Sequence, residues 1–208
     1  MTLLDQILLL ATGLVSIYLI WRFYGAYSKE KHIFDIYYML SFAVLLISGV
    51  LLIFLGWGIL SSPYILTVAS LIPLGISLGL ITQFLPQYGK IYTWFAALGL
   101  LIIAITSIGD MSFKSIAVPL FHGVAGLIIF VLPIYLSFFK KTEPGSFSLV
   151  SLGGVLISIG GMALAFLNAG KPLFGFLTED VILTILAPIL LLMSLCFTWG
   201  FMKDIKSR

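Results

Sequence analysis

Seven blocks of apolar residues, each about twenty residues long, follow one another along the chain and are separated by short polar segments. An α-helix needs about twenty residues to cross a hydrocarbon layer roughly 30 Å thick. The blocks therefore predict an all-α membrane protein, a single transmembrane domain over residues 1–208. Its seven transmembrane helices are expected over residues 3–24, 36–57, 64–84, 91–108, 115–139, 147–168 and 181–201.

The segments between the blocks are short, none longer than about a dozen residues, so they leave no room for a soluble catalytic or sensory domain. The first block differs from a secretory signal, because it carries Asp5 near its start instead of a basic residue. It also ends in Trp21-Arg22 without a small-residue cleavage site. We therefore expect the first block to be a helix of the bundle, and the function to lie within or at the bilayer.

Composition supports the membrane assignment and narrows the chemistry. Only 9% of the residues are charged, 61% are hydrophobic, and the mean hydropathy is +1.20, more than one soluble core of this length could bury. The single cysteine, Cys196, excludes a disulfide framework or a thiolate metal cluster within one chain. One Asn and three Gln are few, as is typical of thermophile proteins and also of strongly hydrophobic ones.

The distribution of Lys and Arg predicts the orientation, because positively charged short loops stay on the cytoplasmic side. One side of the predicted membrane layer has nine of the eleven basic residues, and the other has only Lys114 and Lys171. We expect a multi-pass protein of the cell membrane with its N-terminus outside and its C-terminus in the cytoplasm. The nine are spread over separate short segments, which argues against a nucleic-acid partner. They are Arg22, Lys29, Lys31, Lys90, Lys140, Lys141, Lys203, Lys206 and Arg208.

Short matches between the first three and the last three blocks suggest an internal repeat. Tyr18-Leu19 recurs as Tyr135-Leu136, and Ile65-Leu66-Thr67 recurs as Ile182-Leu183-Thr184, both 117 residues further along. A parallel 3+1+3 duplication is one interpretation, and chance matching of abundant Leu and Ile is the other. In a duplication Pro73 and Pro188 occupy nearly corresponding places, and paired interruptions of this kind are typical of transporter sites.

His122 is the one ionisable side chain well inside a predicted span, about two turns from the outer end of the fifth. Ionisable groups within a membrane are costly to bury and are candidates for function. The alternative is a structural histidine that is hydrogen-bonded to a serine or a backbone carbonyl. Met162 lies at a similar depth in the sixth span, so ligation of haem or copper by His122 and Met162 is also open.

The sixth span has small or weakly polar residues on one face, which indicates either tight helix packing or a lined pathway. An acidic rim at the outer end could attract cations. The residues of that face are Ser151, Gly154, Ser158, Gly161, Ala165 and Asn168, and those of the rim are Asp5, Asp110, Asn168, Glu179 and Asp180. The candidate ligand-binding residues are His122, Pro73, Pro188, Ser158, Gly161, Asn168 and Asp110.

Three classes of function fit these features. The first is a carrier or channel for a small uncharged or weakly cationic solute. The second is a non-transporting subunit or receptor-like sensor bundle with a protein partner on the cytoplasmic side, and the third is a haem, copper or quinone electron-transfer unit. The chain has no H-E-x-x-H motif, no carboxylate pair within a span and no Cys/His arrangement for a nucleophile. We therefore expect a protein that is not an enzyme and has no cofactor. Covalent retinal is excluded, since the seventh span has no lysine at its middle.

The orientation can be tested by cysteine labelling of intact cells. A membrane-impermeant thiol reagent is expected to label Lys171→Cys and to leave Lys140→Cys unlabelled, because only the first position is expected outside. The reverse pattern would overturn the predicted sidedness.

Overall fold

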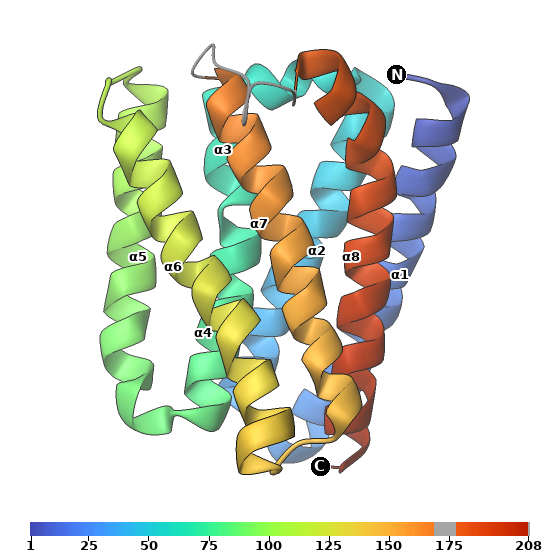
Figure 1. The fold of residues 1–208 in the computed structure, drawn as a ribbon, viewed down its shortest axis with the longest axis vertical. Helices are drawn as coiled ribbons and strands as arrows, with labels where there is room; N and C mark the ends of the chain where they lie inside the picture. Colours follow the sequence, from blue (N-terminus) through green and yellow to red (C-terminus); the bar gives the residue numbers. More distant parts are fainter. Residues whose placement is uncertain (169–177, 208) are drawn as a thin grey trace.

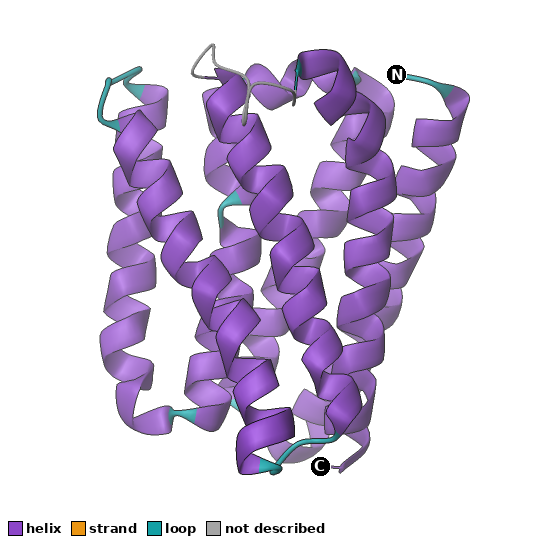
Figure 2. Ribbon diagram, in the orientation of Figure 1, coloured by secondary structure: helices purple, strands orange, loops and turns teal. Residues whose placement is uncertain are grey.

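The computed structural model describes residues 1–168 and 178–207, of which 162–168 and 206–207 are described by their backbone alone. The described chain is helical, with no strand within it (Figure 2). Short 3₁₀ turns lie at Trp57–Ser61 and Gly145–Ser148, and a π-helical turn, Tyr135–Lys140, follows Pro133. The helices, labelled in Figure 1, are α1 (Leu3–Glu30), α2 (Ile33–Leu55), α3 (Pro63–Ala69), α4 (Leu71–Phe84), α5 (Pro86–Ile108), α6 (Lys114–Ile134), α7 (Leu149–Asn168) and α8 (Glu179–Ser207).

Six helical segments of the described chain are long and apolar enough to cross a membrane, so the protein is a helical bundle of the polytopic membrane class. They are Leu3–Glu30, Ile33–Leu55, Pro63–Phe84, Pro86–Ile108, Lys114–Lys140 and Glu179–Ile205. The sixth predicted block corresponds to α7, whose apolar stretch with described side chains, Gly145–Gly161, is shorter. Several helices extend beyond the apolar blocks: α1 continues to Glu30, because polar side chains are compatible with a helix outside the hydrocarbon layer.

The helices pack in chain order around the bundle. α1 contacts α2, α2 contacts α4, α4 contacts α6, α6 contacts α7, α7 contacts α8, and α8 closes the ring on α1, while α5 lies outside against α4 and α6. The chain ends lie at opposite ends of the bundle (Figure 1). We call the end with the C-terminus and the connections 31–32, 85 and 141–144 the basic end, and the end with the N-terminus and residues 109–113 the opposite end.

An aromatic cluster holds α1, α2 and α8 together near the basic end. The ring of Phe201 lies 4.8 Å from that of Tyr38 and 5.4 Å, edge-on, from that of Phe23, measured between centroids. All three side chains are fully buried, and Phe42 and Phe197 extend the cluster. Aromatic rings in such offset and edge-on pairs add about 0.5–1.5 kcal/mol per pair beyond the area that they bury.

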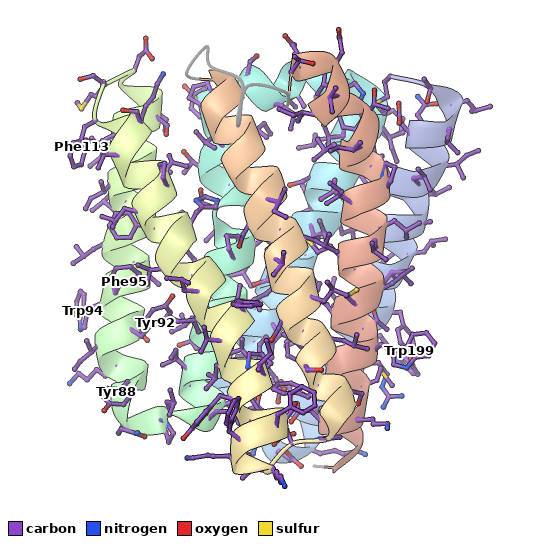
Figure 3. All side chains as sticks on the ribbon, in the orientation of Figure 1. Tyr88, Tyr92, Trp94, Phe95, Phe113 and Trp199 are labelled. Carbon is purple, nitrogen blue, oxygen red and sulfur yellow. The ribbon has the colours of Figure 1, made fainter. Side chains whose placement is uncertain are left out.

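The outer surface of the bundle is apolar, as expected for a surface in contact with lipid. Leu127 on α6 is 63% exposed, and Trp94 on α5 and Trp199 on α8 are similarly exposed. Figure 3 shows Trp94 and Trp199 projecting away from the bundle on opposite sides. Indole rings prefer the boundary between hydrocarbon and headgroups, so these two side chains are placed to mark one edge of the membrane layer.

Glycines allow the neighbouring helices to approach closely. A Cβ added at Gly79 of α4 would lie 2.7 Å from two carbons of the Tyr38 ring on α2. One turn earlier, a Cβ at Gly75 would lie 3.2 Å from the backbone oxygen of Tyr37 and would also collide with Ser41. The Gly75-x-x-x-Gly79 pair is therefore the contact face of α4 toward α2.

The third predicted span has a one-residue break between α3, which ends at Ala69, and α4, which begins at Leu71. Ser70 at the break keeps helical backbone angles, and its N–H and carbonyl are hydrogen-bonded to Leu66 and Leu74. Ser70 lies fully buried at the break, and its hydroxyl donates a hydrogen bond of 2.8 Å to the carbonyl of Leu66. Pro73 accounts for the break: it has no N–H to donate to the carbonyl of Ala69, and its ring crowds that carbonyl. Figure 2 shows the interruption as a short loop between α3 and α4.

The packing at Gly79 can be tested by Gly79→Ala. The added methyl group would overlap the buried Tyr38 ring, so we expect a loss of about 1–3 kcal/mol of stability, seen as a lower thermal midpoint in detergent. Gly123→Ala is the matched control in α6, because a Cβ there meets nothing within 4 Å and alanine favours a helix. Equal midpoints for the two variants would contradict the packing.

Candidate functional site

His122 lies on the face of α6 that packs against α7. Its Nδ1 is 3.2 Å from the carbonyl oxygen of Val118, one turn earlier, so the neutral ring that fits this contact is protonated on Nδ1. A Cβ added at Gly161 of α7 would lie 3.5 Å from Cδ2 and 4.0 Å from Nε2 of the ring. The ring therefore faces Gly161, and Nε2 has no hydrogen-bond partner among the described residues.

From His122 toward the basic end, α6 and α7 stay in close contact for two further turns. Gly126 of α6 packs directly against the side chain of Ser158, and Gly154 of α7 receives Ile129, whose Cβ would lie 3.0 Å from an added Cβ. Small residues thus alternate between the two helices. The small face of α7 is a helix-packing surface over these positions, and Ser158 and Gly161 are both part of it.

The part of the third span that precedes the break packs against α5. Leu66, one turn before Ser70, packs against a buried cluster made of Ile103 on α5 with Val118 and Phe121 on α6. Pro73 is buried beyond the break. On this turn of α6, Phe121 faces Gly99 of α5, whereas the His122 ring faces Gly161 of α7.

The other predicted site residues do not join this group within the described part of the chain. Pro188 is exposed on the outer surface of α8, which continues through it as a regular helix. Neighbouring Ala187 packs with Leu9 and Leu52, on α1 and α2. The side chains of Asn168 and Met162 lie outside the described residues, so the proposed pairing of His122 with Met162 is not placed.

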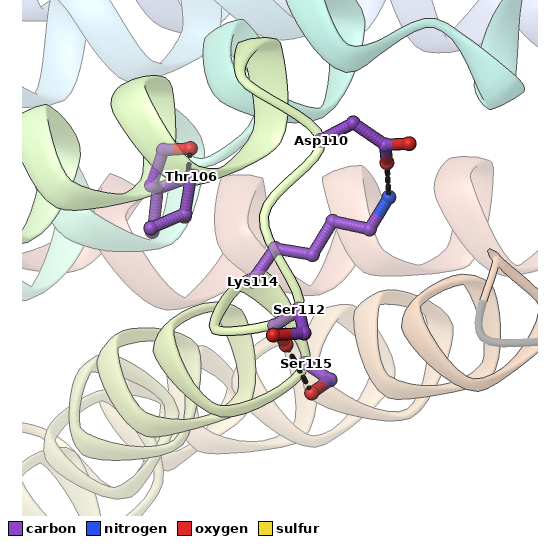
Figure 4. A network of polar contacts seen from close by, with 6 residues as sticks. Thr106, Asp110, Ser112, Lys114 and Ser115 are labelled. Atoms are coloured by element: carbon purple, nitrogen blue, oxygen red, sulfur yellow. Dashed lines mark hydrogen bonds and ion pairs between the residues drawn. The ribbon is translucent and has the colours of Figure 1, made fainter.

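Asp110 has a local role at the opposite end of the bundle. It is exposed, adopts a left-handed backbone conformation in the α5–α6 connection, and forms an ion pair with Lys114 (Figure 4). The Lys114 ammonium lowers the pKa of the Asp110 carboxyl, first through this hydrogen bond and then through its charge. Because the carboxyl pKa is lowered, the pair is intact at neutral pH and is lost as the pH falls through the folded-state pKa.

Asp5, another member of the acidic rim, caps a helix. Its carboxylate accepts hydrogen bonds from the backbone N–H of Thr2 at 2.7 Å and from the Thr2 hydroxyl at 2.9 Å. The Thr2 hydroxyl in turn accepts one from the Asp5 backbone N–H. This reciprocal pair is a capping box at the start of α1, and it accounts for the position of Asp5 without a ligand.

A second polar group, which the sequence does not reveal, lies inside the basic end of the bundle. The Tyr38 hydroxyl of α2 donates to Oε1 of Gln83 on α4 at 2.9 Å, and Nε2 of Gln83 donates to Oδ1 of Asp204 on α8 at 2.8 Å. Asp204 is 2% exposed and Asp35, one turn before Tyr38, is fully buried. We call Asp35, Tyr38, Gln83 and Asp204 the inner polar cluster.

Hydropathy alone could not find this cluster. Gln83 stands at the end of an apolar block and Asp204 in the polar tail, where each is expected to be solvated. The signal that could have found them is helical spacing: Gln83 lies four residues after Gly79, on the face that packs against α2. Asp35 and Tyr38, three apart, likewise share one face of α2.

α4 carries a further buried hydrogen-bonded pair between the two polar regions. The Ser77 hydroxyl donates to the carbonyl of Pro73 at 2.8 Å and accepts a hydrogen bond of 2.8 Å from the Tyr92 hydroxyl of α5. Ser77 is fully buried. Polar groups of α4 thus occur at the break, at Ser77 and at Gln83, along most of the length of the helix.

No family model matches this chain, and neither a curated protein nor a solved structure matches it. The site is therefore interpreted from its own chemistry. Within the described residues no three His, Cys, Asp or Glu side chains lie together as a metal-ion site would require. The groups present can donate and accept hydrogen bonds, and the carboxylates can balance a positive charge.

The inner polar cluster can be tested by Gln83→Leu. This change removes the donor to Asp204 and the acceptor for Tyr38 inside the bundle, and losing one partner of a buried polar group costs about 1–3 kcal/mol. We expect a lower thermal midpoint, while Gln87→Leu, at an exposed position of α5, leaves it unchanged. A Gln83→Leu midpoint equal to that of Gln87→Leu would show that these two hydrogen bonds contribute nothing.

Proposed function

We propose that this protein is a carrier for a small, uncharged or weakly cationic solute. The single observation that carries the proposal is the discontinuous third span, broken at buried Ser70 and followed by Pro73. Interrupted membrane helices occur where the backbone is buried in protein or lines a cavity, and in many transporters they form the substrate site. His122, on α6, supplies a nitrogen acceptor, Nε2.

The class of solute follows from the charges available on each side of the break. The inner polar cluster contains two buried acidic side chains, Asp35 and Asp204. Interior carboxylates and a neutral imidazole are compatible with a weak cation or a hydrogen-bonding neutral molecule.

In this proposal the chain has seven spans, with α3 and α4 forming the third and α7 the sixth. The basic end faces the cytoplasm, and the solute passes between a site at His122 and the inner polar cluster. The 3+1+3 duplication is supported by helix order, since the middle helix lies between the other two in both α1–α2–α4 and α6–α7–α8. Of the two prolines Pro73 and Pro188, only Pro73 is buried and lies beside a break. The interrupted helix of the proposed site therefore belongs to the first half of the chain.

A second candidate is a non-transporting subunit or sensor bundle that contacts a cytoplasmic partner. The observation that favours it is the close packing of α6 on α7 at Gly126, Gly154 and Gly161. A bundle that is closely packed at each helix crossing transmits a shift of one helix to its neighbours. This candidate predicts no solute flux.

The third candidate, an electron-transfer unit, rests on His122 and has no second ligand among the described side chains. An absorption spectrum of the purified protein tests it directly, because bound haem gives an intense Soret band. A spectrum without one excludes haem and leaves the carrier and subunit proposals standing.

The carrier proposal is tested by uptake of radiolabelled methylammonium and glycerol into proteoliposomes. We expect uptake of at least one solute above the rate of protein-free vesicles, and loss of that uptake in His122→Ala. Leu127→Ala, at a lipid-facing position of the same helix, should retain it. The thermal midpoints of both variants establish that each one is folded.

Two outcomes would contradict the proposal at different levels. Wild-type uptake equal to that of empty vesicles for both solutes rejects the carrier function for these two solute classes and favours the subunit. Uptake that persists in His122→Ala keeps the carrier function and removes His122 from its site.

A further inference from the structure

A groove lies on the outside of the bundle at the basic end, where α1 and α8 meet. Its volume is about 320 Å³, at the lower limit of small-molecule sites, and it is open on one side. It is lined on α1 by Trp21, Arg22, Gly25, Ala26, Lys29 and Glu30 and on α8 by Ile205. It is separate from His122 and from the inner polar cluster, so it requires an explanation of its own.

The groove combines a basic clamp, formed by Arg22 and Lys29, with an apolar floor, formed by Gly25 and Ala26. Arg22 and Lys29 are seven residues apart on α1, which places them on one face and about 10 Å apart along the helix axis. Gly25 and Ala26 lie between them, and a Cβ added at Gly25 would meet nothing within 4 Å, so the space above the floor is open. Glu30 also lines the groove, but its carboxylate lies 3.3 Å from Nε2 of His32.

An aromatic ring marks the membrane-facing side of the groove. Trp21 is 63% exposed and lies 6.0 Å from the Arg22 guanidinium, measured to the ring centroid. Tyr18 lies one turn further toward the middle of α1, and its hydroxyl donates a hydrogen bond of 3.4 Å to the sulfur of Met202 on α8. This contact joins α1 to α8 next to the groove. One further turn along α1, toward the middle of the helix, Leu14 is exposed. Together, Trp21, Tyr18 and Leu14 form an apolar track on the outside of α1.

We propose that this groove binds the headgroup phosphate of an anionic phospholipid. Arg22 and Lys29 bind the phosphate oxygens, and the acyl chains lie along Trp21, Tyr18 and Leu14. A cationic pair at the boundary, with aromatic and aliphatic side chains directly inward of it, matches the layout of a phospholipid from headgroup to chain. A free phosphate would use the cationic pair but not the apolar track, and on this ground the lipid is favoured. The proposal does not depend on the carrier function.

Native mass spectrometry of the full-length protein in detergent tests the site with phosphatidylglycerol and phosphatidylcholine as probes. We expect preferential retention of phosphatidylglycerol. Replacing one basic residue near the headgroup should weaken binding by about five-fold, so Arg22→Gln with Lys29→Gln should remove most of the bound lipid. The matched control is Lys140→Gln with Lys141→Gln, which loses the same charge at the same end but outside the groove.

Gly25→Leu provides an independent test that leaves every charge in place. Its side chain would fill the open space above the floor, so we expect phosphatidylglycerol retention to fall while the thermal midpoint is unchanged. Equal retention of the two lipids, or equal losses in the groove and control variants, would overturn the proposal. Displacement of the lipid by inorganic phosphate, with no effect of Gly25→Leu, would assign the clamp to a free phosphate instead and likewise overturn it.

Discussion

Close approach of helix backbones is the constraint on which this bundle depends. In lipid an apolar side chain gains little by leaving its surroundings, so helices are held together by van der Waals packing and by hydrogen bonds between them. Glycines at the crossings provide that packing: Gly79 receives Tyr38 between α4 and α2, and Gly200 receives Val150 between α8 and α7. Each glycine exposes backbone to a side chain of its neighbour, and the number of atoms in contact rises steeply as the helices approach.

Backbone contact at the glycines also determines where polar groups can lie. Because Gly79 admits the Tyr38 ring, the Tyr38 hydroxyl reaches Gln83 one turn further along α4, and Gln83 reaches Asp204 on α8. A larger residue at position 79 would displace the Tyr38 ring and break the hydrogen bond between Tyr38 and Gln83. The inner polar cluster is therefore a consequence of helix packing, as is the contact between His122 and Gly161.

The sequence predicts the coarse architecture well, because hydropathy directly reports which residues contact lipid. It also selects His122 and Gly161 as candidate residues, and the structure brings the two together. It does not find the inner polar cluster, because Asp35, Gln83 and Asp204 are far apart in the chain and each looks solvated alone. From the sequence alone, Pro73 and Pro188 occupy nearly corresponding positions in two apolar blocks. Pro73 is buried just after a break, whereas Pro188 is exposed in a continuous helix.

α4 connects the two polar regions in a way that has mechanical consequences for the proposed carrier. It has 14 residues, begins beside the break at Ser70, and carries Gln83 in its last turn. An α-helix of this length moves as a rigid rod, and the third span can bend near its start at Pro73, which has no N–H to bond to the carbonyl of Ala69. A solute that binds beside His122 and shifts the start of α4 must then also shift Gln83 against Tyr38 and Asp204. The hydrogen bonds of the inner cluster resist that shift by only about 0.5–1.5 kcal/mol each, a cost that solute binding can supply. The same helix can thus couple opening at one end to rearrangement at the other.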